Sequence, residues 1–283
     1  MTLKVAAFDS GVGGLTALAP LFHSGAKIEV TYLGDLAHLP YGSKSSERIQ
    51  ELTSKNLKWL LTESKESKKN FDVCLIACNT ASAHALKVAQ KFSKKLDIPV
   101  IGVIEAGSKR AVDLAKGPIV VLATNATVTS QSYSKTLKKL DSKHSVVEMA
   151  CPLFVPLVEE GLQQSPAAEW IIRHYLDPLF KKSDTAILGC THYPFLVPTL
   201  KKIYPHVKWI DAGGALLFEP KIKKLLKISD SKTSKVVKPH PKSSLKVYLT
   251  DHSTSLNRLE GFLEQLDLKN LALKLSYVPP VVS

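Results

Sequence analysis

Two short segments of the same kind, each centred on a cysteine, constrain the fold of this chain more than any other feature. Cys78 follows an apolar run over residues 71–77, and Cys190 follows a second apolar run over residues 185–189. Each run has the length and composition of a buried strand, and each cysteine is followed by a segment typical of a helix. Each cysteine therefore lies between the end of a strand and the start of a helix. In open α/β folds, ligands bind at this carboxyl end of the strands.

A second feature precedes each cysteine at a similar distance. Asp9 follows a predicted strand and stands 69 residues before Cys78, and Thr124 follows another predicted strand 66 residues before Cys190. The matched spacing indicates a duplicated half-domain that carries one thiol per half. A single cysteine in an α/β protein is more often a small buried hydrophobic residue, but two in the same local setting favour a shared chemical role.

Predicted strands and helices alternate along most of the chain, which favours parallel sheets wrapped by helices. The strands are expected at residues 3–8, 28–34, 71–77, 98–103, 119–123, 145–149, 185–189, 207–210 and 245–249, and the helices at 15–22, 45–66, 80–96, 105–116, 130–140, 167–180 and 254–266. The expected fold is α/β, with two pseudosymmetric, doubly wound parallel-sheet domains and the active site in the cleft between them. We expect residues 1–97 plus 210–283 to form the first domain, because the tail has to pack somewhere, and 98–209 to form the second.

The formal net charge of +13 raises the question of a nucleic-acid or acidic partner. Residues 221–246 hold nine lysines and one acid, so about +8 of the excess lies in this one segment. No aromatic residue that could stack on bases interleaves the lysines, and arginines that could read base edges are few in the chain. We expect a solvated surface with a flexible basic loop over residues 229–244, and no requirement for nucleic acid.

The remaining composition favours a cytoplasmic protein. At 45% hydrophobic and 22% charged residues the chain resembles a soluble globular protein, and no apolar run is long enough to cross a membrane. The N-terminal residues enter a short strand without the apolar region of a signal peptide. The four cysteines, which include Cys74 and Cys151, should therefore be reduced, and because they form no CxxC pair we expect no metal site.

The glycine-rich segment after the first strand, residues 9–14, superficially resembles a dinucleotide-binding turn. It lacks the GxGxxG spacing, and Asp9 would stand where a pyrophosphate has to approach. The glycines instead allow backbone N–H groups to approach a small anion such as a carboxylate. A thiol near a helix N-terminus is also favoured as thiolate, so the sequence predicts a reactive cysteine beside a small-anion site.

Six separated motifs then give the chain a family resemblance. FDSGVGGLT, GDLAHLPYGSKS, ACNTASA, GVIEAG, FVPLVEEG and GCTHYPFL follow one another between residues 8 and 196. In this order and spacing they resemble the glutamate racemases of the cofactor-independent aspartate/glutamate racemase superfamily. The chain departs from the usual pattern at His38, Ala106 and Ala123, none of which is one of the cysteines.

The resemblance implies that the protein interconverts L- and D-glutamate without a metal or another cofactor and supplies D-glutamate for peptidoglycan. Inversion at a carbon requires a base on one face and a proton donor on the other, and two facing thiols would provide that pair. By resemblance Asp9 assists Cys78, while His192 and Glu159 assist Cys190, with Glu160 an alternative to Glu159. Asp9 would accept or shuttle a proton, because a carboxylate does not lower the pKa of a neighbouring thiol.

The substrate contacts follow from the same motifs. Side chains and backbone groups there can donate to two carboxylates and accept from an ammonium; the predicted set is Asp9, Ser10, Tyr41, Gly42, Asn79, Thr80, Thr124, Thr191 and His192. Taken alone, each threonine or asparagine is equally typical of a helix cap.

Two rival functions remain open at this point. An aspartate or hydantoin racemase of the same superfamily would share the motifs, and activity on L-aspartate would distinguish it. A basic, non-catalytic binding protein would explain the charge, and its binding would depend on residues 229–244. A homodimer is compatible with the sequence, which does not fix the assembly.

Overall fold

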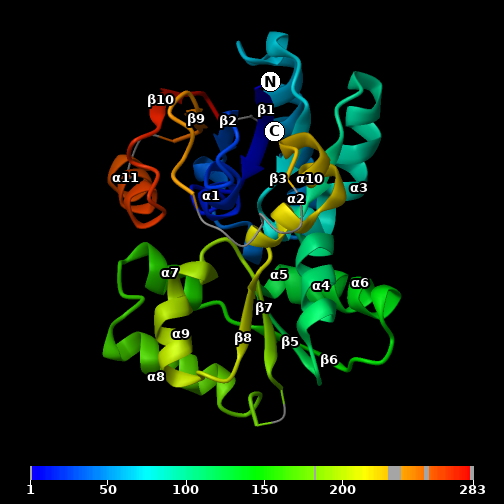
Figure 1. The fold of residues 1–283 in the computed structure, drawn as a ribbon, viewed down its shortest axis with the longest axis vertical. Coiled ribbons are helices and arrows are strands. Elements are labelled where there is room, and N and C mark those ends of the chain that lie inside the picture. The colour runs from blue at the N-terminus through cyan, green and yellow to red at the C-terminus, as the bar shows by residue number, and fades with distance from the viewer. Residues whose placement is uncertain (1, 182, 229–236, 252–254, 281–283) are drawn as a thin grey trace.

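Two parallel β-sheets, one above the other, dominate the protein (Figure 1). The computed structural model describes residues 2–181, 183–228, 237–251 and 255–280. The strands are β1 (Leu3–Asp9), β2 (Ile28–Gly34), β3 (Val73–Ile76), β4 (Val100–Gly102), β5 (Ile119–Ala123), β6 (Val146–Ala150), β7 (Thr185–Gly189), β8 (Lys208–Asp211), β9 (Ser244–Leu249) and β10 (Ala272–Tyr277). All described pairings are parallel.

The two halves of the chain repeat one strand order. The first sheet runs β10-β9-β2-β1-β3-β4 and the second runs β6-β5-β7-β8. Without the two C-terminal strands, the first sheet has its second strand outermost, then its first, third and fourth, and the second sheet repeats that order. The predicted α/β class with two pseudosymmetric parallel sheets is confirmed. In such sheets the strand order reverses beside the first strand, and ligands bind at that switch point.

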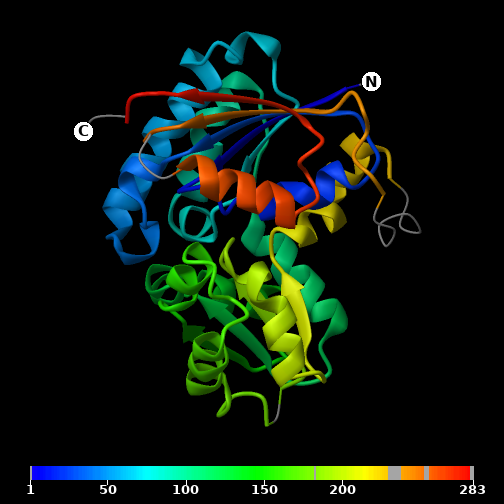
Figure 2. The same cartoon turned by 90° about the vertical axis from the view of Figure 1, so that its left-hand side faces the viewer.

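Helices cover the sheets and fill the space between them (Figures 1 and 2). They are α1 (Leu15–Phe22), α2 (Ser46–Lys58), α3 (Asn79–Ser93), α4 (Val103–Leu114), α5 (Asn125–Ser130), α6 (Ser132–Leu140), α7 (Phe154–Glu159), α8 (Pro166–Leu176), α9 (Val197–Ile203), α10 (Pro220–Leu226) and α11 (Ser255–Gln265). Short 3-10 turns η1 (Leu36–His38), η2 (Tyr41–Ser43), η6 (Tyr193–Leu196) and η7 (Gly214–Phe218) join several of them.

Local sequence explains where two of these helices begin. The Ser45 side chain accepts a hydrogen bond from the Arg48 backbone N–H at the start of α2, and Ser165 does the same for α8 ahead of Pro166. A serine cap satisfies a backbone N–H that has no partner inside the helix, and proline suits the first helical position because it lacks that N–H.

The boundary between the halves differs from the expectation. Residues 98–102 were assigned to the second half, but β4 pairs with β3 in the first sheet. The other expected boundary, between residues 209 and 210, falls inside β8, which pairs with β7 in the second sheet. The first sheet therefore continues to Gly102, and the second includes Asp211. Backbone pairing decides both assignments, and local residue patterns do not encode it.

The C-terminal tail completes the first sheet. Strand β9 pairs with β2, and β10 pairs with β9 as a further edge strand that the sequence analysis did not predict. Of the predicted flexible loop 229–244, residues 229–236 lie outside the described residues. The rest of it is tied to the first half: Val237 N donates to His23 O at 3.0 Å, Ile28 N donates to Ser243 Oγ at 3.0 Å, and Ser244 begins β9.

Candidate active site between the two sheets

Cys78 lies directly after β3, at the start of α3. Its backbone is extended and its sulfur accepts from the Ala81 backbone N–H at 3.4 Å, so the thiol itself caps the helix. The thiol donates to Ser10 Oγ, 3.6 Å away, in the turn after β1. Strands β1 and β3 are neighbours, and their carboxyl ends therefore bring residues 68 positions apart in the sequence into contact.

The surroundings of Cys78 keep its thiol protonated. Burial above all, together with the charge of Asp9, raises its pKa to about 12, and the contacts with the Ala81 N–H and with Ser10 only partly oppose this. The helix N-terminus, which was expected to favour thiolate, is thus outweighed by loss of solvent. The charge on Cys190 also raises the pKa of Cys78, so the two sulfur atoms are coupled across the gap between the halves.

Asp9 ends β1, and its carboxyl group is completely buried. Its Oδ2 accepts from Gly11 N at 2.9 Å, whereas its Oδ1 has no hydrogen-bond partner among the described residues. Burial raises the pKa of Asp9, and the charge of His192 and three backbone N–H groups work against that shift. An acid with one unpaired buried oxygen can accept a proton or an ammonium hydrogen bond, since leaving it unpaired is costly.

Cys190 occupies the equivalent place in the second half, directly after β7. His192 Nδ1 lies 4.0 Å from Cys190 Sγ, and His192 Nε2 lies 3.2 Å from Glu159 Oε1 at the end of α7. Burial lowers the pKa of His192, but the interactions with Cys190 and Glu159 are stronger together and raise it to about 10. At neutral pH the ring is therefore an imidazolium held between a sulfur and a carboxylate.

Direct contacts hold the two halves together around these groups. Thr80 Oγ1 is 2.9 Å from Thr124 Oγ1 and 3.2 Å from Thr127 Oγ1. On the other side, the Thr16 hydroxyl donates to the Thr191 backbone oxygen at 2.9 Å. The threonine contacts join the start of α3, after β3, to the segment after β5, and the Thr16 contact joins the start of α1 to the segment after β7.

Gly42 marks a further close approach between the halves. A Cβ added there would lie 2.7 Å from Thr124 Cβ, well inside van der Waals contact. Any larger residue at this position would separate the loop of the first half from the second half, which explains the glycine.

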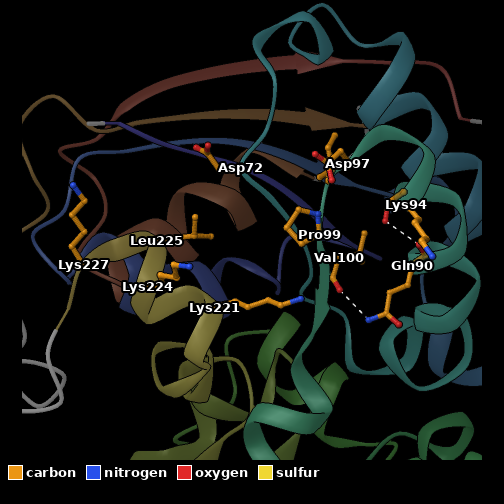
Figure 3. A pocket seen from close by; sticks show the side chains of 12 residues that line it. Asp72, Gln90, Lys94, Asp97, Pro99, Val100, Lys221, Lys224, Leu225 and Lys227 are labelled. Atoms are coloured by element: carbon orange, nitrogen blue, oxygen red, sulfur yellow. Dashed lines mark hydrogen bonds between the residues drawn. The ribbon is translucent and has the colours of Figure 1, made fainter.

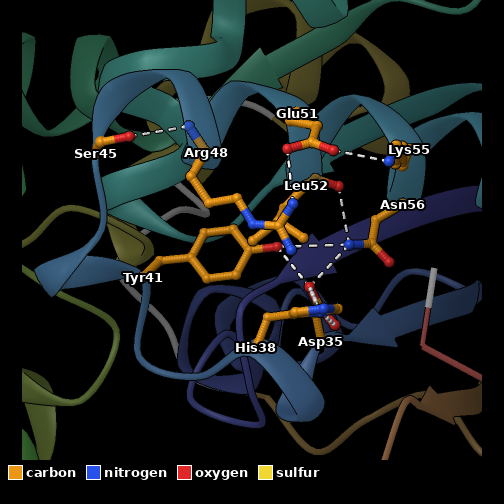
Figure 4. Close-up of polar contacts among 9 residues, drawn as sticks. All are labelled: Asp35, His38, Tyr41, Ser45, Arg48, Glu51, Leu52, Lys55 and Asn56. Carbon is orange, nitrogen blue, oxygen red and sulfur yellow. Dashed lines mark hydrogen bonds and ion pairs between the residues drawn. The ribbon is translucent and has the colours of Figure 1, made fainter. Parts of the chain in front are cut away.

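Tyr41, expected to bind substrate, directs its hydroxyl to Asp35 (Figure 4). The hydroxyl donates to Asp35 Oδ2 at 2.6 Å, in a buried cluster where Asp35 also accepts from Asn56 and Thr250 and contacts His38 Nδ1. A buried carboxylate requires such partners. In this structure Tyr41 therefore fixes the loop that presents Gly42.

Sequence reasoning missed three polar residues that support the site. The Tyr32 hydroxyl donates to Gly11 O at 2.6 Å beneath Asp9, and the Tyr133 hydroxyl donates to Asn79 Oδ1 at 2.6 Å. Thr127 completes the threonine contacts described above. The two tyrosines are completely buried, and a buried phenol needs a partner, so a tyrosine inside an apolar pattern was the available signal.

The other two cysteines lie outside this arrangement. Cys74 is buried inside β3, and Cys151 is buried at the end of β6. Burial raises the pKa of Cys74 to about 12 and raises that of Cys151 as well. Across the part of the chain that the structure describes, no three His, Cys, Asp or Glu side chains gather as a metal ion would need.

Two open cavities of the described surface are lined by residues other than the thiols and their partners. One of 690 Å³ lies between the C-terminal end of α3, β4 and α10, and lysines such as Lys221 and Lys224 line it (Figure 3). Another of 830 Å³ lies between α2, α3, α4 and α6. Cys78 and Cys190 are only 5% and 8% exposed, so the reactive groups occupy a closed site.

Among the described residues, no helix combines the length and apolar character that crossing a bilayer requires. The chain matches the family model for Asp/Glu/Hydantoin racemase over residues 23–217. It is 39% identical to the glutamate racemase of Sulfurihydrogenibium sp. (strain YO3AOP1) over 276 residues, covering 97% of this chain and 98% of that protein. It is 37% identical to that of Persephonella marina (strain DSM 14350 / EX-H1) over 278 residues, with coverages of 98% and 99%.

A solved structure gives the same result. The structure of glutamate racemase from Francisella tularensis subsp. tularensis SCHU S4 in complex with D-glutamate superposes with a TM-score of 0.78 at 32% identity, covering 98% of this chain and 97% of that one. The resemblance stated from the sequence motifs is confirmed. The chain therefore belongs to the Asp/Glu/hydantoin racemase family, among its glutamate racemases.

Proposed function

We propose that this protein interconverts L- and D-glutamate through Cys78 and Cys190 acting on opposite faces of the α-carbon, and thereby supplies D-glutamate for peptidoglycan. The observation that supports this most directly is that two half-sites with the same strand order each place one thiol directly after the equivalent strand of their own sheet. Each thiol has its own proton-handling group: Asp9 for Cys78 and His192 for Cys190.

The reaction follows from where the protons are. In one direction the Cys190 sulfur, beside the His192 imidazolium, removes the α-proton as a thiolate. The electron pair of the broken C–H bond stays on the substrate, and the protonated Cys78 thiol gives its proton to the opposite face. Cys190 then holds a proton and Cys78 is the thiolate, so the same site runs the reverse reaction. No electrons are gained or lost: Cys190 keeps the proton taken from the substrate, and Cys78 supplies the proton that replaces it.

The glutamate substrate needs partners for two carboxylates and an ammonium. The unpaired Asp9 oxygen suits the ammonium, and the backbone N–H groups of the glycine-rich turn suit a carboxylate. Ser10, Asn79, Thr80, Thr124 and Thr191 complete the proposed substrate site with Tyr41, Gly42 and His192, and Tyr41 also holds its own loop through Asp35. We assign glutamate in preference to aspartate because the full-length relatives described above are named glutamate racemases.

The test is circular dichroism of the purified protein with L-glutamate and no added cofactor. The signal should decay to zero as equal amounts of the two enantiomers form, and dialysis against a chelator and hydroxylamine should leave the rate intact. Decay with L-aspartate in place of L-glutamate would point to the rival racemase, and no decay with either would contradict the proposal. Sedimentation of the same preparation tests the proposed homodimer, and cell fractionation tests a cytoplasmic location.

Glu159→Gln should shift the alkaline loss of racemase activity to a lower pH. Contact with Glu159 is one of the two influences that raise the pKa of His192 to about 10. The protonated ring supports the Cys190 thiolate only below that pKa, so activity is expected to fall as pH rises through it. Loss of the carboxylate lowers the pKa and moves this alkaline decline toward neutrality. The measurement is turnover of L-glutamate against pH, with Glu160→Gln as the matched control; equal profiles for both variants would contradict the assignment of Glu159.

A further inference from the structure

We propose that Phe262, on the C-terminal helix α11, is a positioning residue for His192 and thereby supports the chemistry of Cys190 alone. The inference rests on the proposed function. It starts from a contact that neither the motifs nor the duplicated half-domain predicts: a residue of the tail reaches across to the second half.

Phe262 is buried against two rings of the second half. Its ring lies edge-on to the His192 imidazole, with centroids 5.9 Å apart and an interplanar angle of 77°. On the adjacent side it packs against Phe195, with centroids 4.5 Å apart. Phe262 is 4% exposed and His192 is also 4% exposed. Edge-to-face contact of this kind is a favoured geometry for aromatic rings, and it leaves the imidazole little room to turn toward α11.

The polar contacts of His192 alone do not fix the orientation of its ring. Its Nδ1 lies 4.0 Å from the Cys190 sulfur, at the outer limit for a hydrogen bond to sulfur, and Glu159 holds only the opposite nitrogen at 3.2 Å. A ring pinned at one nitrogen can still swing about that contact. The backbone of Gly13 on one side and Phe262 on another stop this movement, since close packing leaves no volume for a second orientation.

Helix α11 is itself firmly placed. Its own residues Leu259 and Leu263 are buried in the core. His23 Nε2 lies 2.9 Å from the backbone oxygen of Leu266, just past the end of the helix. Gln163 Nε2 donates to Gln265 Oε1 at 3.3 Å, a second contact from the other half. Figures 1 and 2 both show α11 in the upper half, above the lower half that carries α7. The helix can therefore transmit a fixed position to His192.

The contact has no described equivalent on the other thiol. Thr80 stands two residues after Cys78 as His192 does after Cys190, and its described partners are the hydroxyls of Thr124 and Thr127. Loss of the Phe262 ring should therefore weaken proton removal by Cys190 while sparing proton removal by Cys78. If Phe262 only held the helix in place, its loss would not produce such a one-sided effect.

Racemisation alone cannot reveal the asymmetry. The two enantiomers of glutamate have equal free energy, so kcat/KM has to be the same in both directions in every variant. A half-reaction is needed, and a glutamate analogue with chloride on its β-carbon provides one. The thiolate removes the α-proton, the electron pair forms the Cα–Cβ double bond and chloride leaves; the enamine then hydrolyses to a keto acid and ammonia. Each enantiomer reports on the thiol that faces its α-proton.

The experiment compares Phe262→Leu, which keeps apolar volume but removes the flat ring, with wild type on both enantiomers of the analogue. We expect chloride release to fall about tenfold for the enantiomer served by Cys190, because a small displacement of a catalytic group is costly, and to stay within about twofold for the other. Phe262→Tyr, which keeps the ring, should restore the wild-type ratio. Gly261→Ala is the control on the same helix, since no atom lies within 4 Å of the added Cβ, and it should leave chloride release from both enantiomers at the wild-type rate.

An unchanged ratio in a folded Phe262→Leu protein, or the same loss for both enantiomers, would overturn the inference. If that variant melts below the assay temperature, Phe262→Met replaces it and the same ratio decides. If the wild-type protein racemises glutamate but Phe262→Leu leaves the ratio between the two enantiomers unchanged, only the role of Phe262 is overturned. Wild-type protein inactive on glutamate and on both analogue enantiomers would overturn the proposed function itself.

Discussion

Replacing either Cys78 or Cys190 with serine should lower racemisation by about 10³-fold, because the reaction needs both a base and a proton donor. A serine hydroxyl is a far weaker acid than a thiol and cannot replace either one. The two sulfur atoms belong to equivalent positions after β3 and β7, so neither variant should keep racemase activity through the remaining thiol.

The remaining thiol should still carry out its half of the chemistry. With the β-chloro analogue of glutamate, Cys78→Ser should release chloride from one enantiomer and Cys190→Ser from the other. By family resemblance we expect Cys78 to serve the D-enantiomer and Cys190 the L-enantiomer. Cys74→Ser is the matched control, since that thiol is buried inside β3, and it should leave both reactions within a few-fold. The same enantiomer preference in both variants would show that one face carries all of the proton removal.

Gly13→Ala should reduce turnover by about 10²-fold, the scale expected when a catalytic group is displaced. A Cβ at residue 13 would lie 2.7 Å from both His192 Cε1 and Thr191 Oγ1. These side chains have to move, and His192 would leave its place between Cys190 and Glu159. The conflict involves side-chain atoms of the second half, so we expect the melting temperature to change little. Turnover and thermal melting of the same preparation measure the two effects.

Gly261→Ala is the matched control for that substitution. No atom lies within 4 Å of a Cβ added there, on α11, and alanine is favoured over glycine inside a helix by about 0.5–1 kcal/mol. Full activity with equal or slightly higher thermal stability is expected. Near wild-type turnover of Gly13→Ala would mean that the halves separate easily at this contact and that His192 tolerates displacement.

Local patterns were sufficient to predict most elements of this fold. The predicted bounds of the helix at 15–22 and of the strands at 28–34, 119–123 and 185–189 agree with the structure, because each is a continuous apolar or periodic segment ended by glycine or polar residues. Strand β10 was missed although Leu273, Leu275 and Tyr277 alternate with other residues. It is an edge strand whose first three residues are exposed, so burial leaves a weak pattern.

In the candidate site, the positions of the main residues along the chain were predictable from the sequence. The motifs predicted that one region holds a set of residues that each end or follow a strand, or end a helix: Asp9, Cys78, Glu159, Cys190 and His192. The direction of a side chain is a different matter. The hydroxyl of Tyr41 turns to Asp35, which no spacing rule predicts. The contact of Phe262 with His192 depends on where the tail packs, a property of three-dimensional structure that is not written in any local stretch of sequence.

The first sheet is built from both ends of the chain, and this fixes an order of events during synthesis. Strands β1 to β4 are made first, but β2 remains an edge with unpaired backbone groups until β9 is made about 140 residues after β4. The second sheet, in contrast, comes from one uninterrupted stretch and can form as soon as β8 leaves the ribosome. Domains generally fold as units during synthesis. The first half is therefore begun before the second and completed after it, with its edge exposed to wrong pairing in the interval.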